Sequence, residues 1–237
     1  MVIAMYLAHL VGDYVLQWDA LARWKSREIK GVLAHGMIVL VVTWLLSLPF
    51  DAGWWPWALA IGLTHTAVDA ATLWLGKRLP LQGNGTLALA RYLIDQVVHF
   101  GIITLVLVWS GHLTAPAGTA GLVAELRHHR LLVLALGYTF ITLPSWILVQ
   151  FAVYGLVNGS APDFSRSASK YMGILERGLI TTCVIAGQFL LVPLVTLPRL
   201  LLEGPQVRGG SHVTLYITEL LASVALAVAI GLVLRLL

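Results

Sequence analysis

Charged residues are scarce in this chain: Asp, Glu, Lys and Arg together make up only 11% of its 237 residues. Soluble domains carry about 25% charged residues, so this composition excludes a soluble globular enzyme. A disordered chain is excluded as well, because such chains are rich in charge and poor in apolar residues. Cysteine is nearly missing: Cys183 stands alone, so no disulfide can form within the chain.

Apolar residues are correspondingly abundant in this chain. The residues AVILMFWYC make up 59% of the chain, or about 140 positions, and one membrane-spanning helix needs about 20 of them. The apolar runs lie at 2–18, 31–50, 55–75, 87–110, 131–157, 172–198 and 213–235. We therefore predict an all-α polytopic transmembrane bundle of about seven spans. The first run lacks the basic region and cleavage site of a signal peptide, so we expect it to be retained.

A loop at 111–130, rich in Gly, Ala and Pro, is the best internal boundary. It predicts a four-span bundle over residues 1–112 and a three-span helical part over 113–237. The segment 18–30 mixes Trp, Leu and basic residues. It is either a short interfacial helix lying against lipid headgroups or a plain basic loop.

The basic residues near the span ends predict the orientation. Eleven of the 15 Lys and Arg residues fall on one set of loops, which the positive-inside rule places in the cytoplasm. The N-terminus is then outside and the C-terminus cytoplasmic, in a multi-pass protein of the bacterial inner membrane. The surplus of +4 charges reports this orientation, so no nucleic acid is expected as a partner. Membrane lipid is the expected partner, and a second copy or another membrane protein is left open. Arg177, at the inner start of the sixth run, is expected to snorkel to the interface.

Histidines and aspartates are the informative polar residues of the first four runs. They are His9 and Asp13 in the first, His35 in the second, His65 and Asp69 in the third, and Asp95 and His99 in the fourth. Residues four apart share one helix face, so each His–Asp pair presents an imidazole and a carboxylate in one direction. With a rise of about 1.5 Å per residue, and with alternating span directions, all of them fall in one layer about 7–18 Å from the cytoplasmic ends.

Ionisable groups within a bilayer cost several kcal/mol each unless they pair, hydrate or bind a cation. A divalent ion would stabilise three crowded carboxylates, and imidazole with carboxylate suits zinc first, then manganese or iron. We predict His9, His35, His65, Asp69 and His99 as metal ligands. Asp13 and Asp95 are predicted as further ligands or as the general base of a hydrolytic reaction. Seven donors exceed one tetrahedral zinc, so either two ions are bound or some carboxylates orient the histidine ligands.

Other functions for the same residues stay open at this point. Paired His and Asp side chains also build ion, proton or solute pathways, although the outer halves of these four runs hold almost no ionisable groups. The side chains could instead join helices by hydrogen bonds, or hold a haem between facing imidazoles. Haem ligation does not require the accompanying aspartates, which count against it.

The opening motif resembles a known family. HLVGDYVLQ, with His9, Gly12, Asp13 and Gln17, followed by a basic loop and then His35, resembles the start of an uncharacterised family of bacterial integral-membrane proteins, known only as a domain of unknown function. The later segments HTAVDA and DQVVHF look like subsequent motifs of that family, and YMGILERGLI is similar to a signature in its second half. The resemblance implies a membrane protein and no particular activity.

A looser resemblance concerns HTAVDAAT, whose His65, Asp69 and Thr72 are similar to a motif of membrane-bound metal-dependent hydrolases. Those proteins are in turn similar to zinc-dependent phospholipases C. The resemblance implies that His65 and Asp69 are ligands and that phosphodiesters are the substrate class. The sequence thus favours a metal-dependent hydrolase acting on a lipid or other amphiphile from the cytoplasmic side. The alternatives are an ion- or proton-coupled transporter or channel, and a non-catalytic membrane subunit.

Overall fold

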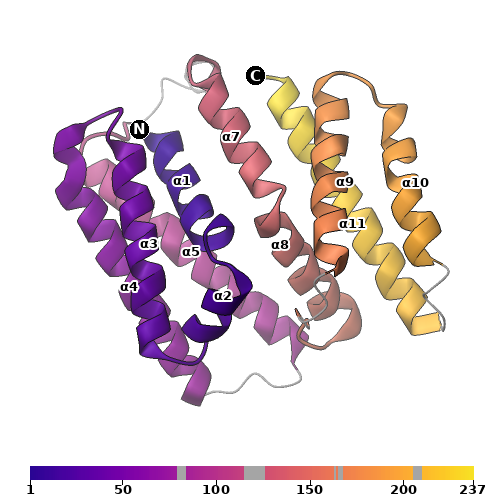
Figure 1. The fold of residues 1–237 in the computed structure, drawn as a ribbon, viewed down its shortest axis with the longest axis horizontal. Helices are drawn as coiled ribbons and strands as arrows, with labels where there is room; N and C mark the ends of the chain where they lie inside the picture. The colour runs from indigo at the N-terminus through magenta and orange to yellow at the C-terminus, as the bar shows by residue number, and fades with distance from the viewer. Residues whose placement is uncertain (79–83, 115–125, 163, 165–167, 205–209) are drawn as a thin grey trace. The chain divides into compact units, whose positions relative to one another are not determined.

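The computed structural model of the chain describes residues 1–78, 84–114, 126–162, 164, 168–204 and 210–237. All regular elements in these residues are helices (Figure 1), as the composition predicts. They are α1 (Val2–Leu10), η1 (Val11–Val15), α2 (Asp19–Lys25), α3 (Ile29–Ser47), η2 (Ala52–Trp54), α4 (Trp55–Arg78), α5 (Gly85–Trp109), α7 (Arg130–Phe140), α8 (Leu143–Val153), η3 (Tyr154–Asn158), α9 (Ala168–Ile185), α10 (Leu191–Glu203) and α11 (Gly210–Arg235). Residues 115–125 of the predicted boundary loop lie outside the described residues.

Several of these helices are long and apolar enough to cross a membrane. Four helical segments meet this length and hydropathy requirement by themselves, namely Ile29–Ser47, Ala52–Arg78, Gly85–Trp109 and Val213–Arg235. The bent pair that begins with α7 and α8 makes a fifth if it forms one span. The described helices therefore account for four or five of the seven spans that the sequence predicts. The predicted first span is only the shorter apolar helix Val2–Val15. The predicted sixth is divided between α9 and α10 by a turn at Gly187, whose φ of 76° is a left-handed conformation that ends helices.

The outer faces of these helices are apolar. Leu33 and Met37 on α3, Leu63 on α4 and Val97 on α5 are each at least 52% exposed. Exposed apolar groups of this size are costly in water, whereas lipid accommodates them. This surface supports the conclusion from composition that the chain is a membrane protein.

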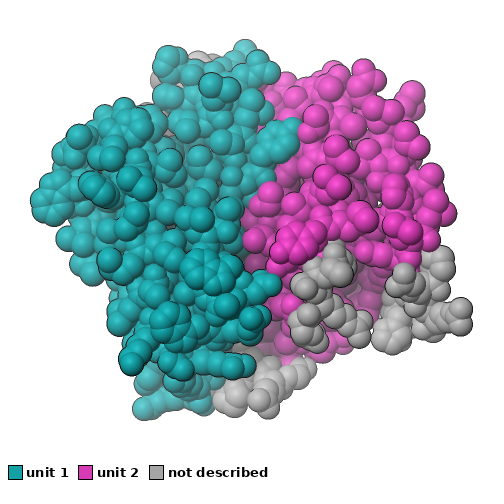
Figure 2. All heavy atoms as spheres, in the orientation of Figure 1, with its two compact units in different colours: residues 1–81, 91–139 teal, residues 82–90, 140–237 magenta. Residues whose placement is uncertain are grey.

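The chain divides into two compact units, coloured separately in Figure 2. Unit 1 consists of residues 1–81 and 91–139, and unit 2 of residues 82–90 and 140–237. Unit 1 contains α1, α2, α3 and α4, and most of α5 and α7. All seven histidines and aspartates of the predicted site belong to unit 1.

Two glycines bring α3 and α4 close together in unit 1. A Cβ added to Gly36 would overlap the hydroxyl of Thr66, and one added to Gly62 would lie 2.6 Å from Cβ of Leu40. Small residues at helix contacts are the usual means of close packing in membranes. Because His35 precedes Gly36 and His65 precedes Thr66, this contact also draws the two imidazoles together.

We expect Gly36→Ala to destabilise the protein by about 1–3 kcal/mol, because the new methyl group overpacks the α3–α4 contact. The matched control is Gly101→Ala on α5, where an added Cβ meets no atom within 4 Å. The control should be neutral or stabilising, since Gly costs about 0.5–1 kcal/mol more than Ala within a helix. Thermal unfolding followed by size-exclusion chromatography checks both variants, and a Gly36→Ala protein as stable as wild type would contradict the packing argument.

The chain between α1 and α3 contains a π-helical turn and then a short helix. The turn η1 includes Gly12 and the buried Asp13, and π-helical turns occur frequently at functional sites. Residues 19–25 form α2, so part of this segment is helical; its predicted position against lipid headgroups stays a prediction. A Cβ on Gly31 would lie 2.5 Å from the backbone nitrogen of Lys25, and this close approach lets the end of α2 lie against α3.

Unit 2 contains a buried network of charges. Arg199 on α10 donates to Glu176 over 3.1 Å and to Glu203 and Glu219 over 3.0 Å each. Arg177 on α9 is 1% exposed, so the prediction that it snorkels to the interface is wrong. The backbone oxygens of Ile141 and Thr142, between α7 and α8, accept from its guanidinium at 2.8 and 3.0 Å, and the hydroxyl of Ser223 does so at 3.1 Å.

Candidate metal centre

Unit 1 collects the predicted histidines and aspartates in one buried region. They come from α1 (His9), η1 (Asp13), α3 (His35), α4 (His65 and Asp69) and α5 (Asp95 and His99). The four histidines are each at most 2% exposed, and Asp13 and Asp69 are 6% and 4% exposed. Only the side chain of Asp95 is partly accessible, at 20%. Asp69 follows His65 by four residues, so both side chains lie on one face of α4.

The centre of the region is a pair of imidazoles from α3 and α4. The Nε2 atoms of His35 and His65 are 3.1 Å apart. An oxygen of Asp13 lies 3.0 Å from Nε2 of His35 and 3.8 Å from that of His65. An oxygen of Asp69 lies 3.7 and 3.2 Å from the same two atoms. A tetrahedral zinc ion, with bonds of about 2.0–2.2 Å, holds its ligand atoms about 3.3–3.6 Å apart, so these spacings fit a metal ion.

The protonation states open to the His35 and His65 imidazoles also favour a cation at this position. Two imidazole nitrogens in such contact cannot both carry hydrogen, because the two N–H groups would point at each other. At least one of the Nε2 atoms is therefore a bare acceptor beside the carboxylates of Asp13 and Asp69. Burial keeps water from these acceptors, so a cation is needed beside them, and the amine of Lys25 or a metal ion can fill this role. The group of Asp13, His35 and His65 could hold a metal ion.

His65 and Asp69 form a second group with His99, in which the ligand atoms all lie within 4.8 Å of one another. Nδ1 of His99 lies 2.8 Å from the backbone oxygen of Asp95. A carbonyl oxygen can only accept, so Nδ1 carries the proton and Nε2 of the neutral ring is bare. This Nε2 is buried, and none of the described residues offers it a hydrogen bond. Metal-ligating histidines are commonly held in this way, with the second nitrogen donating to a carbonyl.

His9 and Asp95 surround these two groups without belonging to either. The ring of His9 stacks on that of His99, with centroids 5.4 Å apart. Nε2 of His9 contacts the amide oxygen of Gln96 at 3.4 Å, and the amide nitrogen of Gln96 donates to Asp13 and Asp95 at 3.3 Å each. The described geometry thus gives His9 and Asp95 supporting positions, and Gln96 links them to Asp13.

Lys25 also belongs to this region, although the sequence places it only among the basic residues of the segment 18–30. Its amine lies 2.8 Å from an oxygen of Asp69 and 3.5 Å from one of Asp13. Burial disfavours the charged amine, but the two carboxylates outweigh burial and raise the pKa of Lys25 above its ordinary value. The lysine is therefore a fixed cation beside the carboxylates. No local pattern distinguishes it from Arg23 or Arg27; only the packing of α2 on α3 places it here.

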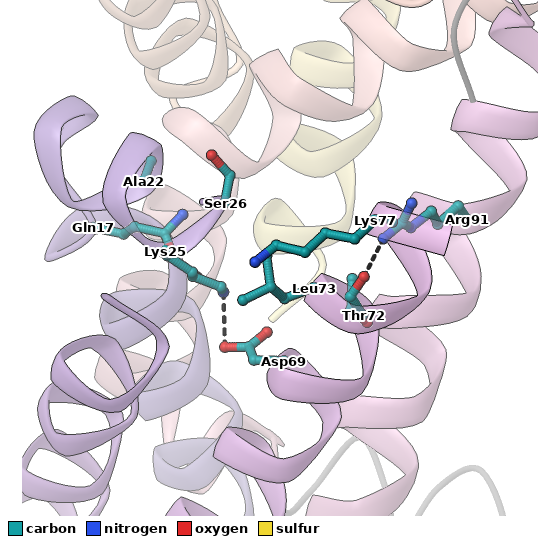
Figure 3. A pocket seen from close by; sticks show the side chains of 10 residues that line it. Gln17, Ala22, Lys25, Ser26, Asp69, Thr72, Leu73, Lys77 and Arg91 are labelled. Atoms are coloured by element: carbon teal, nitrogen blue, oxygen red, sulfur yellow. Dashed lines mark hydrogen bonds and ion pairs between the residues drawn. The ribbon is translucent and has the colours of Figure 1, made fainter. Parts of the chain in front are cut away.

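A pocket of about 390 Å³ opens beside the carboxylate of Asp69. Figure 3 shows its lining, which comes from the segment around α2, the last turns of α4 and the first part of α5. The lining residues are Gln17, Ala22, Lys25, Ser26, Asp69, Thr72, Leu73, Gly76, Lys77 and Arg91. Asp69 belongs both to this lining and to the second donor group, so a molecule in the pocket would lie next to the candidate metal centre.

The comparison with protein families identifies the first half of the chain. The family described as "Protein of unknown function (DUF3307)" matches residues 1–125, slightly more than half of the chain. The match contains every residue of the two donor groups and every residue that lines the pocket. No curated protein and no solved structure matches the chain. The resemblance to membrane-bound hydrolases therefore stays a prediction from sequence.

Proposed function

The chain belongs to the DUF3307 family of proteins of unknown function, and we propose that it is an integral-membrane metal-dependent hydrolase. The proposal rests on one observation: Asp13, His35, His65, Asp69 and His99 form two buried groups of donor atoms that share His65, and Asp69 of the second group also lines a pocket. The proposed substrate is a lipid or another amphiphile with an ester bond, including phosphodiesters. The proposed ion is zinc, with manganese and iron as less preferred alternatives.

The proposed orientation places the pocket at the cytoplasmic leaflet of the bacterial inner membrane. Lys25, Lys77 and Arg91, which line the pocket, belong to the larger set of basic residues, and this set is cytoplasmic under the positive-inside rule. With seven spans, the N-terminus would be outside and the C-terminus inside. A substrate would then enter from the inner leaflet or from the cytoplasm.

The residues divide into distinct roles under this proposal. The ion, once bound, would activate water and polarise the ester that is to be cleaved. Asp13, His35, His65, Asp69 and His99 would hold it. Asp95 belongs to neither donor group, so its carboxylate would be left to act as the general base. It lies near the pocket, because it accepts a hydrogen bond of 3.1 Å from Thr72, which lines the pocket. His9 would position His99 by stacking against its ring.

Elemental analysis of the detergent-purified full chain tests the metal. After growth in zinc- and manganese-supplemented medium, we expect about one or two ions per chain, and a protein without stoichiometric metal would refute the proposal. Release of nitrophenol from bis(p-nitrophenyl) phosphate, lost on treatment with a chelator, tests hydrolysis. Bound metal without cleavage of phosphodiester or carboxylic ester probes would reject the hydrolase and leave a metal-binding membrane protein.

The contact of Lys25 with Asp69 favours a second candidate function, an ion- or proton-coupled transporter. A lysine paired with buried carboxylates is itself a counter-charge, so such a centre can work without a metal and exchange protons instead. Proton or cation flux in proteoliposomes, lost in Asp69→Asn, would support this candidate. Absence of flux together with stoichiometric metal would support the hydrolase.

Lys25→Gln separates the two candidates. If a divalent ion balances Asp13 and Asp69, we expect this variant to stay folded and to keep the metal content of wild type, because the ammonium repels the ion. If Lys25 is the main counter-charge, the variant leaves buried carboxylates unpaired and should lose about 3–5 kcal/mol of stability. Metal content and thermal unfolding of the same preparations decide the question. Lys30→Gln, which changes an exposed residue at the start of α3, is the matched control.

A further inference from the structure

The pocket beside Asp69 has more positive than negative charge. Lys25, Lys77 and Arg91 line it, and Asp69 is the acidic residue of the lining. The charge of Lys25 is balanced within the metal centre, where its amine contacts Asp69 and Asp13. Lys77 and Arg91 therefore remain as the two cations that face the pocket without a carboxylate partner among the described residues.

Arg91 is held in a defined position. Its guanidinium donates to the backbone oxygen of Thr72, as the dashed line in Figure 3 marks. A Cβ on Gly76 would lie 2.7 Å from a guanidinium nitrogen of Arg91, so glycine at this position makes room for the side chain. One backbone oxygen satisfies only part of the five N–H donors of an arginine. The rest remain available to a ligand.

Lys77 reaches the same pocket from the last turn of α4. In Figure 3 its side chain extends across the pocket, and its amino group points to the side on which Lys25 and Asp69 lie. No ion pair or hydrogen bond joins this amine to the described residues. The next residue, Arg78, stands outside the lining, and its guanidinium lies 4.3 Å from the ring centroid of Trp74.

We propose that this pocket binds the phosphate group of the substrate through Lys77 and Arg91, an inference that rests on the proposed function and specifies its substrate class. Phosphate carries up to two negative charges and several acceptor oxygens, and a guanidinium fork and a lysine amine together match them. A pocket of about 390 Å³ is at the small end of the range of about 300–1,000 Å³ for small-molecule sites. It suits a headgroup, with any acyl chains left in the membrane.

Calorimetric titration of the full chain in a phosphate-free maltoside detergent tests the inference. The probes are inorganic phosphate and monomeric dihexanoyl phosphatidic acid. We expect both to bind wild type and to bind Lys77→Gln and Arg91→Gln about tenfold or more weakly, the usual loss when a charged hydrogen bond is removed. Tighter binding of phosphatidic acid identifies a lipid headgroup as the ligand, and equal binding identifies a soluble phosphate compound. Arg78→Gln is the control and should bind like wild type.

Two results would overturn the inference: neither probe binds wild type, or Arg78→Gln weakens binding as much as Lys77→Gln does. The second result would mean that only general surface charge attracts the anion. Metal content measured in the same samples separates this inference from the proposed function. Stoichiometric metal without phosphate binding rejects the phosphate site alone. Phosphate binding that depends on Lys77, in a protein free of metal, rejects the metal centre and leaves the phosphate site standing.

Discussion

His65→Ala should reduce the metal content of the purified chain from stoichiometric to background. Among the described histidines, His65 alone belongs to both donor groups, and its Nε2 lies 3.1 Å from Nε2 of His35 and 3.2 Å from an oxygen of Asp69. Its removal takes a ligand from either position at which an ion could sit. Each group then keeps only two of its three donors, fewer than the three protein ligands of a catalytic zinc site.

Elemental analysis checks this expectation, and His128→Ala is the matched control. His128 is exposed and lies outside both donor groups, so its loss should leave the metal content unchanged. Retention of metal by a folded His65→Ala protein would exclude the proposed centre. His35→Ala and His99→Ala each remove a ligand from one group only. If two ions are bound, each of these variants should keep about one.

Arg199→Leu should cause the largest loss of stability, on the order of 3–5 kcal/mol, the usual cost of breaking a buried ion pair from one side. The side chain of Arg199 is 3% exposed and contacts Glu176, Glu203 and Glu219. Glu176 is buried to the same degree, so its carboxylate would lose its cation without gaining water. Thermal unfolding of the purified protein, monitored by the loss of the monodisperse peak in chromatography, measures the effect.

The cause of this loss is testable with a second substitution. If the unpaired carboxylate of Glu176 destabilises the Arg199→Leu protein, adding Glu176→Gln should recover part of the stability, because the amide is neutral. Arg130→Gln changes an exposed arginine on α7 and should leave stability within about 0.5 kcal/mol of wild type. An Arg199→Leu protein as stable as wild type would mean that the network contributes little. Metal content should stay unchanged in all these variants, since unit 1 contains the donor groups.

The sequence predicts much of the site because its signals are local. The four-residue spacing of His65 and Asp69 puts both on one helix face, whatever the rest of the chain does. The number of spans is less predictable. Residues 172–198 are mostly apolar, yet Gly187 and the turn around it divide them into α9 and α10. Hydropathy averaged over a window does not register the left-handed residue that ends a helix.

The amino-acid sequence by itself determined the all-α membrane character of this protein, because a shortage of charge and an excess of apolar residues leave a chain few other ways to fold. It also determined which helices carry imidazoles and carboxylates. Only the tertiary structure decided which of these side chains meet, setting His35, His65 and Asp69 at the centre and His9 around them. It alone brought Lys25 to the carboxylates and Arg91 to the pocket. Such contacts depend on helix packing between residues distant in sequence, which no local pattern encodes.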